Sequence, residues 1–168
     1  MTASRVSPPP TATDDVVAAW VALLRAHARL TRELNASLLT EHGLTVNDYE
    51  VLLLLARAPG RRLRRVDLSE SLLLTASGIT RLLEGLERLG YVNRAGCPSD
   101  GRVVYAELTP AGLERLRDAS GSHLADLETH FRPRFDDEEL ALLGRLLARL
   151  CDASDIEPES CSPPPAAG

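Results

Sequence analysis

Short hydroxyl side chains lie next to an arginine at residues 75–81 and offer the hydrogen-bonding chemistry that base edges require. Serine and threonine hydroxyls can reach base edges or phosphates, and an arginine can bind guanine through two parallel hydrogen bonds. If a helix begins here, its exposed early residues form one contact surface. That surface comprises Thr75, Ala76, Ser77, Gly78, Thr80 and Arg81.

Arginines on both sides of this stretch supply the charge that a phosphate backbone would need. The chain carries a formal net charge of −5, but residues 57–102 hold nine arginines against five acids, a local net of +4, so the remainder carries −9. Every basic side chain is an arginine, since the sequence contains no lysine. Local charge governs attraction to phosphates, so we expect backbone contacts from this region. The residues assigned to those contacts are Arg62, Arg64, Arg65, Arg94 and Arg102.

No sequence pattern indicates catalysis, a cofactor or a metal. There is no Gly-x-Ser-x-Gly, no phosphate-binding glycine loop and no His-Glu-x-x-His, so we predict that the chain is not an enzyme. Cys97, Cys151 and Cys161 are widely spaced and are expected to be free thiols. Cys97 stands between two arginines and could sense oxidation, but an incidental exposed thiol is favoured. His42, His123 and His130 could suggest zinc binding, but solvated surface histidines are favoured because the spacing is wrong for a helical metal site.

Apolar periodicity and capping signals predict the elements that position these residues. A first helix spans about 14–42, a second follows the Thr-x-x-Asp cap at Thr45, and two short helices follow, the latter capped by Thr75. After Gly90 the period changes to two, which predicts a hairpin over 91–108. Thr109-Pro110 and Asp136-x-x-Glu139 then begin two closing helices. The predicted order is α-α-α-α-β-β-α-α.

This order predicts a mainly α (α+β) fold, a winged helix-turn-helix with a long N-terminal helix and two C-terminal dimerisation helices. In that arrangement the second of the two short helices enters the major groove of double-stranded DNA and the hairpin loop lies beside it. The predicted organisation is a disordered tail over 1–12, a dimerisation helix over 13–44, a DNA-binding lobe over 45–108, dimerisation helices over 109–152 and a disordered tail over 153–168.

An ordered series of segments resembles the MarR family of bacterial regulators. The segments are Leu68-Ser69-Glu70, Leu74–Leu83, Leu86–Arg94, Asp100-Gly101-Arg102 and Leu108-Thr109-Pro110-Ala111-Gly112, and the resemblance covers roughly residues 14–150. The wing of the family usually reads Asp-Arg-Arg. Asp100-Gly101-Arg102 keeps the pair that braces the wing, Asp100 and Arg102, but lacks one phosphate-contacting arginine. The resemblance implies a symmetric dimer that binds a near-palindromic operator, usually as a repressor released by a small ligand.

The length of the first helix supports a dimer independently. Some 29 residues at 1.5 Å each give about 43 Å, longer than this small domain could cover, so its apolar stripe is expected to pack on a second subunit. Two recognition helices would then lie about 34 Å apart, one DNA turn.

Each candidate effector residue also has a structural interpretation. Trp20 and His27 could line a pocket for an aromatic or phenolic ligand, although interface packing is favoured. Asp48 and Arg81 stand 33 positions apart, as do an aspartate and an arginine in the urate-responsive branch of the family. The favoured interpretation is that Asp48 completes a helix cap and Arg81 contacts DNA.

The sequence also allows an alternative function and indicates a cellular location. The rival is a dimeric ligand-sensing or protein-interaction module that keeps the fold with little DNA affinity. No stretch approaches the roughly 20 apolar residues of a membrane span, and residues 1–10 lack the apolar core of a signal peptide, so a cytoplasmic protein is expected.

Overall fold

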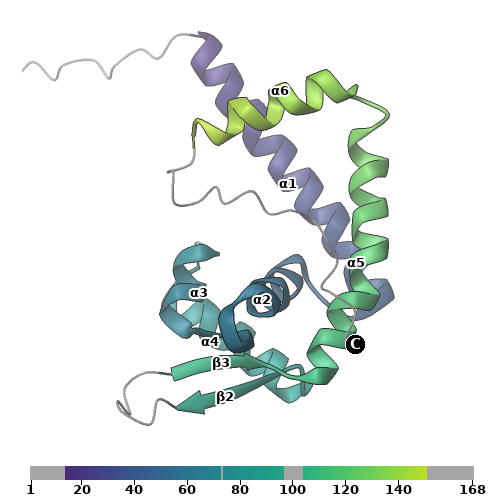
Figure 1. Cartoon of the computed structure of the whole chain (residues 1–168). Helices are drawn as coiled ribbons and strands as arrows, with labels where there is room; N and C mark the ends of the chain where they lie inside the picture. The colour runs from purple at the N-terminus through teal and green to yellow at the C-terminus, as the bar shows by residue number, and fades with distance from the viewer. Residues whose placement is uncertain (1–13, 73, 97–103, 151–168) are drawn as a thin grey trace, which may run out of the picture. The chain divides into compact units, whose positions relative to one another are not determined.

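The computed structural model describes residues 14–72, 74–96 and 104–150 (Figure 1). The elements are α1 (Asp14–His42), α2 (Val46–Arg57), the 3₁₀ turn η1 (Pro59–Arg61), β1 (Arg62–Arg64), α3 (Arg65–Ser71), α4 (Ala76–Arg88), β2 (Val92–Gly96), β3 (Val104–Leu108), α5 (Pro110–Phe131) and α6 (Asp137–Ala148). The predicted order of helices and strands is confirmed, with one short strand added. No helix of the described residues is long and apolar enough to cross a membrane.

The chain forms two units, and the boundary between them, at Glu33 and Leu34, falls inside α1. The first unit contains the N-terminal part of α1, where Val16, Trp20 and Leu24 are 61%, 58% and 46% exposed. These three residues recur every four positions and so share one helix face. Thr13, the predicted N-cap of this helix, lies outside the described residues, as do both predicted tails.

In the second unit, local capping signals fix where the helices begin and end. Gly43 has a φ of +65°, a left-handed conformation that ends α1 at little cost for glycine. The Thr45 hydroxyl accepts from the Asp48 amide, and the Asp48 carboxylate accepts from the Thr45 amide at 2.8 Å. The predicted capping box of α2 is therefore confirmed.

A three-stranded antiparallel sheet in the order β1-β3-β2 supports α2, α3 and α4. The predicted hairpin is present and pairs Val92 with Leu108 and Gly96 with Val104. The sequence did not predict β1, which pairs Leu63 with Ala106. Three residues are too few to show an alternating pattern, so this strand depends on its partner.

One apolar core joins the sheet to the helices around it. Its fully buried side chains come from α1, α2, α3, α4, β2 and α5, and include Leu38, Leu52, Leu68, Leu86, Val92 and Leu116. Burying side chains of this size contributes about 1.5–3 kcal/mol each relative to exposure. The core therefore holds α3 and α4 against the sheet.

The end of α4 is joined to the start of α5 by close backbone contacts. The Tyr91 carbonyl accepts from the Thr109 amide at 3.0 Å, and the Thr109 hydroxyl donates to the Gly90 carbonyl at 2.7 Å. Gly112, in the first turn of α5, lies so close that a Cβ there would be 2.1 Å from Tyr91 O. In the same joint, Arg115 Nε donates to the Tyr91 hydroxyl at 3.1 Å.

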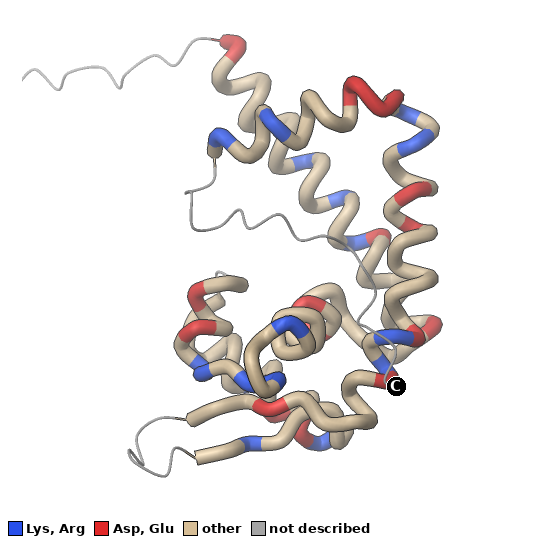
Figure 2. Tube along the Cα trace, in the orientation of Figure 1, with Lys and Arg blue, Asp and Glu red and all other residues tan. Residues whose placement is uncertain are grey.

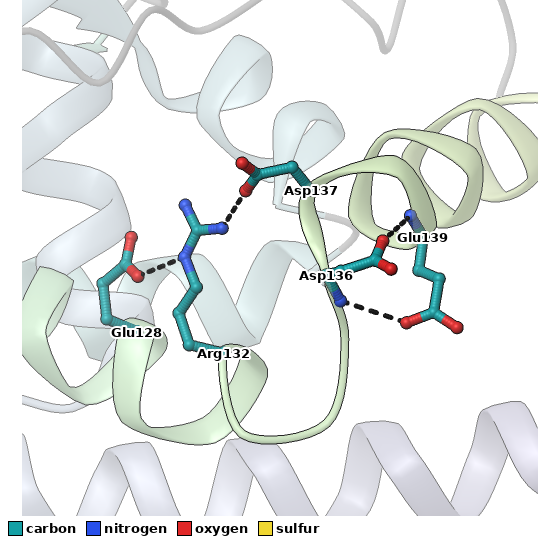
Figure 3. Close-up of polar contacts among 5 residues, drawn as sticks. All are labelled: Glu128, Arg132, Asp136, Asp137 and Glu139. Carbon is teal, nitrogen blue, oxygen red and sulfur yellow. Dashed lines mark hydrogen bonds and ion pairs between the residues drawn. The ribbon is translucent and has the colours of Figure 1, made fainter.

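Charged side chains shape the connection from α5 to α6 (Figure 3). Arg132 Nε donates to Glu128 at 2.7 Å and its Nη1 donates to Asp137, so one guanidinium bridges the two helices. Asp136 and Glu139 form the predicted capping box, in which each carboxylate accepts from the other residue's amide. These two carboxylates also lie at the positive end of the helix dipole.

His123 is buried, so the expectation of a solvated surface histidine is wrong at this position. It is 9% exposed, and its ring centroid lies 4.6 Å from that of Tyr49 on α2. Its Nδ1 has no hydrogen-bond partner among the described residues. Burial lowers the pKa of His123 below its usual 6.5, and the charge of Asp126 opposes this shift.

Gly112→Ala tests the joint between α4 and α5. The added methyl group meets the Tyr91 carbonyl, so we expect the free energy of unfolding to fall by about 2–3 kcal/mol, measured by urea denaturation. Gly121→Ala is the matched control in the same helix. A Cβ at Gly121 meets nothing within 4 Å, so stability should rise by about 0.5–1 kcal/mol. Equal effects at the two positions would contradict the steric account.

The burial of His123 predicts a dependence of stability on pH. Because its pKa is lower in the folded than in the unfolded chain, the unfolded chain binds more protons as the pH falls below about 6.5. We therefore expect stability to fall between pH 7.5 and 5, and His123→Gln to reduce that fall. Denaturation midpoints for both proteins across this range measure it. An unchanged pH profile in the variant would show that His123 does not contribute.

Candidate nucleic-acid interface

Helices α3 and α4 form the helix-turn-helix that the sequence predicts. The turn between them is held by the Leu74 amide, which donates to the Ser69 carbonyl at 2.9 Å. One face of α4 is buried through Ile79, Leu83 and Leu86. Its opposite face carries polar side chains and stays open to solvent, as a helix that enters a groove of DNA requires.

The three hydroxyl groups of this segment differ in what they can still do. The Thr75 hydroxyl accepts from the Gly78 amide at 3.1 Å and so caps α4 as predicted. The Thr80 hydroxyl donates to the Ala76 carbonyl at 2.7 Å, so its proton is already used. Among the described residues, the Ser77 hydroxyl has a hydrogen bond only with the Thr75 hydroxyl, at 3.2 Å, and Ser77 is exposed. Of the three hydroxyls, Ser77 therefore keeps the most capacity for a new hydrogen bond, whereas Thr75 and Thr80 bond to the backbone of the helix.

The small residues at the start of α4 allow close approach. Ala76 is exposed, and Gly78 is half-buried beneath the cap. A Cβ at Gly78 would lie 3.2 Å from the Thr75 hydroxyl oxygen, tighter than ordinary contact. Gly78 thus serves the cap geometry, and only its backbone could face a ligand.

Arg81 is exposed on the polar face of α4 and has no hydrogen bond or ion pair with any described residue. Its five N–H donors are therefore available to a partner. A side chain of this kind on the exposed face of a helix-turn-helix can form the two parallel hydrogen bonds that guanine accepts.

The arginines around α3 differ in their contacts. Arg62 lies over the Tyr105 ring, with its Cζ 5.2 Å from the ring centroid. Arg64 forms two hydrogen bonds with Asp67, at 2.7 and 2.5 Å, and that carboxylate raises the pKa of Arg64 above its usual value. Within the part of the chain that the structure describes, Arg65 donates only to the Thr80 hydroxyl, at 3.4 Å. The sequence alone makes all three equivalent phosphate ligands and misses Tyr105 and Asp67, although Arg64 and Asp67 have the spacing of a helical ion pair.

On β2, Arg94 Nε lies 3.4 Å from a carboxylate oxygen of Glu87 on α4. Acidic and basic segments are interspersed over this lobe rather than gathered in separate patches (Figure 2). The predicted wing contact Arg102, its bracing partner Asp100, and Cys97 lie outside the described residues.

The candidate effector residues belong to two units that are described separately. Trp20 and His27 are exposed in the first unit, and Asp48 is engaged in the cap of α2. A hollow of about 140 Å³ between α2 and α3 is lined by Glu50, Leu53, Leu54, Ser71 and Leu72, and thus by none of the candidates. Within the described ranges, no cluster of three or more His, Cys, Asp or Glu side chains could hold a metal ion.

Comparison with known proteins matches the chain to the MarR family in both sequence and structure. A sequence profile described as MarR family matches residues 42–103. The HTH-type transcriptional repressor YetL of Bacillus subtilis is 32% identical over 111 residues, which cover 64% of this chain and 66% of that protein, just under two thirds of its length.

Two solved structures from Streptomyces coelicolor match over most of their length. AbsC, a MarR family transcriptional regulator, is 33% identical with a TM-score of 0.74, over 84% of this chain and 95% of AbsC. Sco3205, a MarR family transcriptional regulator in complex with DNA, is 28% identical with a TM-score of 0.78, over 95% of this chain and 98% of Sco3205.

Proposed function

The chain belongs to the MarR family of transcriptional regulators, and from this premise we propose that it is a sequence-specific DNA-binding repressor that acts as a homodimer on a near-palindromic operator. The observation that carries the proposal is the exposed Ser77 and Arg81 face of α4, with both side chains left available for a partner. The DNA complex of Sco3205 supports it, because that protein has the same fold.

Phosphate contacts hold α4 in the groove in this proposal. Arg62 and Arg65 lie on the strand and helix next to α4, and neither is paired with a carboxylate of the described residues. Arg94 and Arg102 are assigned to the wing. These contacts supply affinity that falls steeply with salt, while Ser77 and Arg81 supply the dependence on sequence.

Exposed apolar residues on α6 support association of two copies. Leu142 and Leu146 on α6, and Leu150 just beyond its end, recur every four residues and are 47%, 48% and 74% exposed, and α6 itself has no buried residue. A continuous apolar stripe of this kind is typical of an interface. A two-fold axis through such an interface would present two α4 helices to a symmetric operator.

Release by a small aromatic or phenolic ligand completes the proposal. Such a ligand weakens operator binding if it binds more tightly to a conformer of the dimer in which the two α4 helices have a different spacing. The loss of operator affinity cannot exceed the ratio of the ligand's affinities for the two conformers. Trp20 and His27 are the proposed contacts. Asp48 already accepts from the Thr45 amide and hydroxyl, which favours its capping role over ligand binding.

The rival is a dimeric ligand-sensing or interaction module with little affinity for DNA. A salt titration of binding to random duplex separates the two. A steep log–log slope indicates phosphate contacts and supports the regulator, whereas a flat slope supports the rival.

Selection of bound duplexes from a random pool tests the proposed base contact. We expect wild type to enrich a near-palindrome, and Arg81→Ala to relax one position in each half-site at a cost of about 1–3 kcal/mol. Arg117→Ala, a substitution of an exposed arginine on α5, is the control and should leave the enriched sequence unchanged. A uniform loss of affinity in Arg81→Ala would assign that residue to the backbone instead.

Mass measurement in solution tests the dimer. Wild type should have twice the chain mass of 18.2 kDa, and Leu146→Glu should shift the equilibrium toward one chain mass because it places a charge in the apolar stripe. Ala141→Glu changes an exposed position on the other side of α6 and should leave the mass unchanged. A wild-type protein that is monomeric at micromolar concentration would refute the homodimer.

A further inference from the structure

The ion pair between Arg64 and Asp67 joins the end of β1 to the first turn of α3, next to Arg65, which contacts Thr80 on α4. Arg64 is the last residue of β1 and the N-cap residue of α3. Its Nε and Nη2 each donate to one Asp67 oxygen, at 2.7 and 2.5 Å, so the two planar groups meet edge to edge. The side chains remain 52% and 31% exposed, so solvent and a ligand can reach the pair.

The neighbouring arginines are not neutralised in this way. Arg65 is adjacent in sequence and contacts a hydroxyl, which leaves its positive charge uncompensated. Arg81 has no partner among the described residues. The surface therefore mixes arginines that are ready to meet a phosphate, such as Arg65 and Arg81, with arginines that are already paired with an acid, such as Arg64 and Arg94.

We propose that Asp67 is a specificity-determining residue: it competes with the DNA phosphate backbone for Arg64 and so holds down the affinity for DNA of arbitrary sequence. The inference rests on the proposed function, because it assumes that this face meets DNA. Each arginine free to bind phosphate raises affinity for every duplex alike. Arg64 leaves Asp67 and binds a phosphate only where base contacts hold that phosphate next to Arg64. The ion pair therefore lowers the affinity for random DNA more than the affinity for the operator.

The opposite role for Asp67 makes the opposite prediction. If Asp67 orients Arg64 toward DNA, then loss of the carboxylate weakens binding. The structure favours competition, because both carboxylate oxygens are engaged and a phosphate brought to Arg64 would lie close to their negative charge.

The test uses the full-length chain and a fluorescent random-sequence duplex, with anisotropy measured over a range of KCl concentrations. We expect Asp67→Asn to bind the random duplex about two- to fivefold more tightly, because exposed pairs of this kind are weak enough for a phosphate to displace. The log–log salt slope should steepen by about 0.9 for each additional phosphate that the variant neutralises. Weaker or unchanged binding by Asp67→Asn would overturn the proposal.

Glu70→Gln is the charge-matched control. Glu70 is one turn from Asp67 on the same helix and is exposed, so its substitution removes the same charge without releasing a hydrogen-bonded arginine. The increase in affinity in Asp67→Asn should exceed that in Glu70→Gln, and it should disappear in the Arg64→Ala background. An increase that persists without Arg64 would show a general charge effect and overturn the proposal.

Two further readouts separate the possible failures. Thermal melts of each variant show whether it is folded, and Asp67→Glu, which keeps the carboxylate, should retain wild-type affinity. If wild type shows no salt-dependent binding to any duplex, the proposed function itself fails. If wild type binds and Asp67→Asn behaves like Glu70→Gln, only the inference about Asp67 fails.

Discussion

The close approach of two backbones at Tyr91 and Gly112 is the constraint on which the rest of the lobe depends. The Tyr91 amide donates to the Leu86 carbonyl and closes the turn after α4, the Tyr91 carbonyl accepts from the Thr109 amide at the start of α5, and no side chain fits between that carbonyl and Gly112. The end of α4, the start of the hairpin and the start of α5 therefore meet at one point. Because side chains are not involved in the closest contact, its geometry leaves little room for adjustment.

The arginines of β1, α3 and α4 differ from one another in the groups that they contact. One stacks on an aromatic ring, one is held by a carboxylate, one rests on a hydroxyl, and Arg81 is left without a partner in the described residues. Formal charge counts all of them equally. Their availability to a phosphate differs, because an ion pair or a stack must be broken or shared before a new contact forms.

Local signals explain why much of the fold could be predicted from the sequence. The caps at Thr45, Thr75, Thr109 and Asp136 depend on residues three positions apart, and all four are present. Features that depend on distant partners were missed. The strand β1 exists only because β3 lies beside it, and the burial of His123 comes from Tyr49 on another helix.

In the candidate site, too, features that depend on local sequence could be predicted, and features that depend on side-chain partners could not. The positions of Ser77 and Arg81 on the exposed face of α4 follow from helical periodicity, which the sequence contains. The distinction between Ser77 and Thr80 does not, because it depends on which hydroxyl bonds back to the helix. The pairing of Arg94 with Glu87 likewise requires α4 to pack on β2.

The exclusive use of arginine gives the proposed DNA-binding surface a fixed chemical character. A guanidinium stays protonated throughout the physiological range, and it is not a substrate for the acetylation that neutralises lysine. Because the sequence contains no lysine, its positive charge cannot be changed by acetylation of side-chain amines. Any adjustment of that surface must come from its carboxylates, from the geometry of the helices, or from methylation that alters hydrogen bonding while it preserves charge.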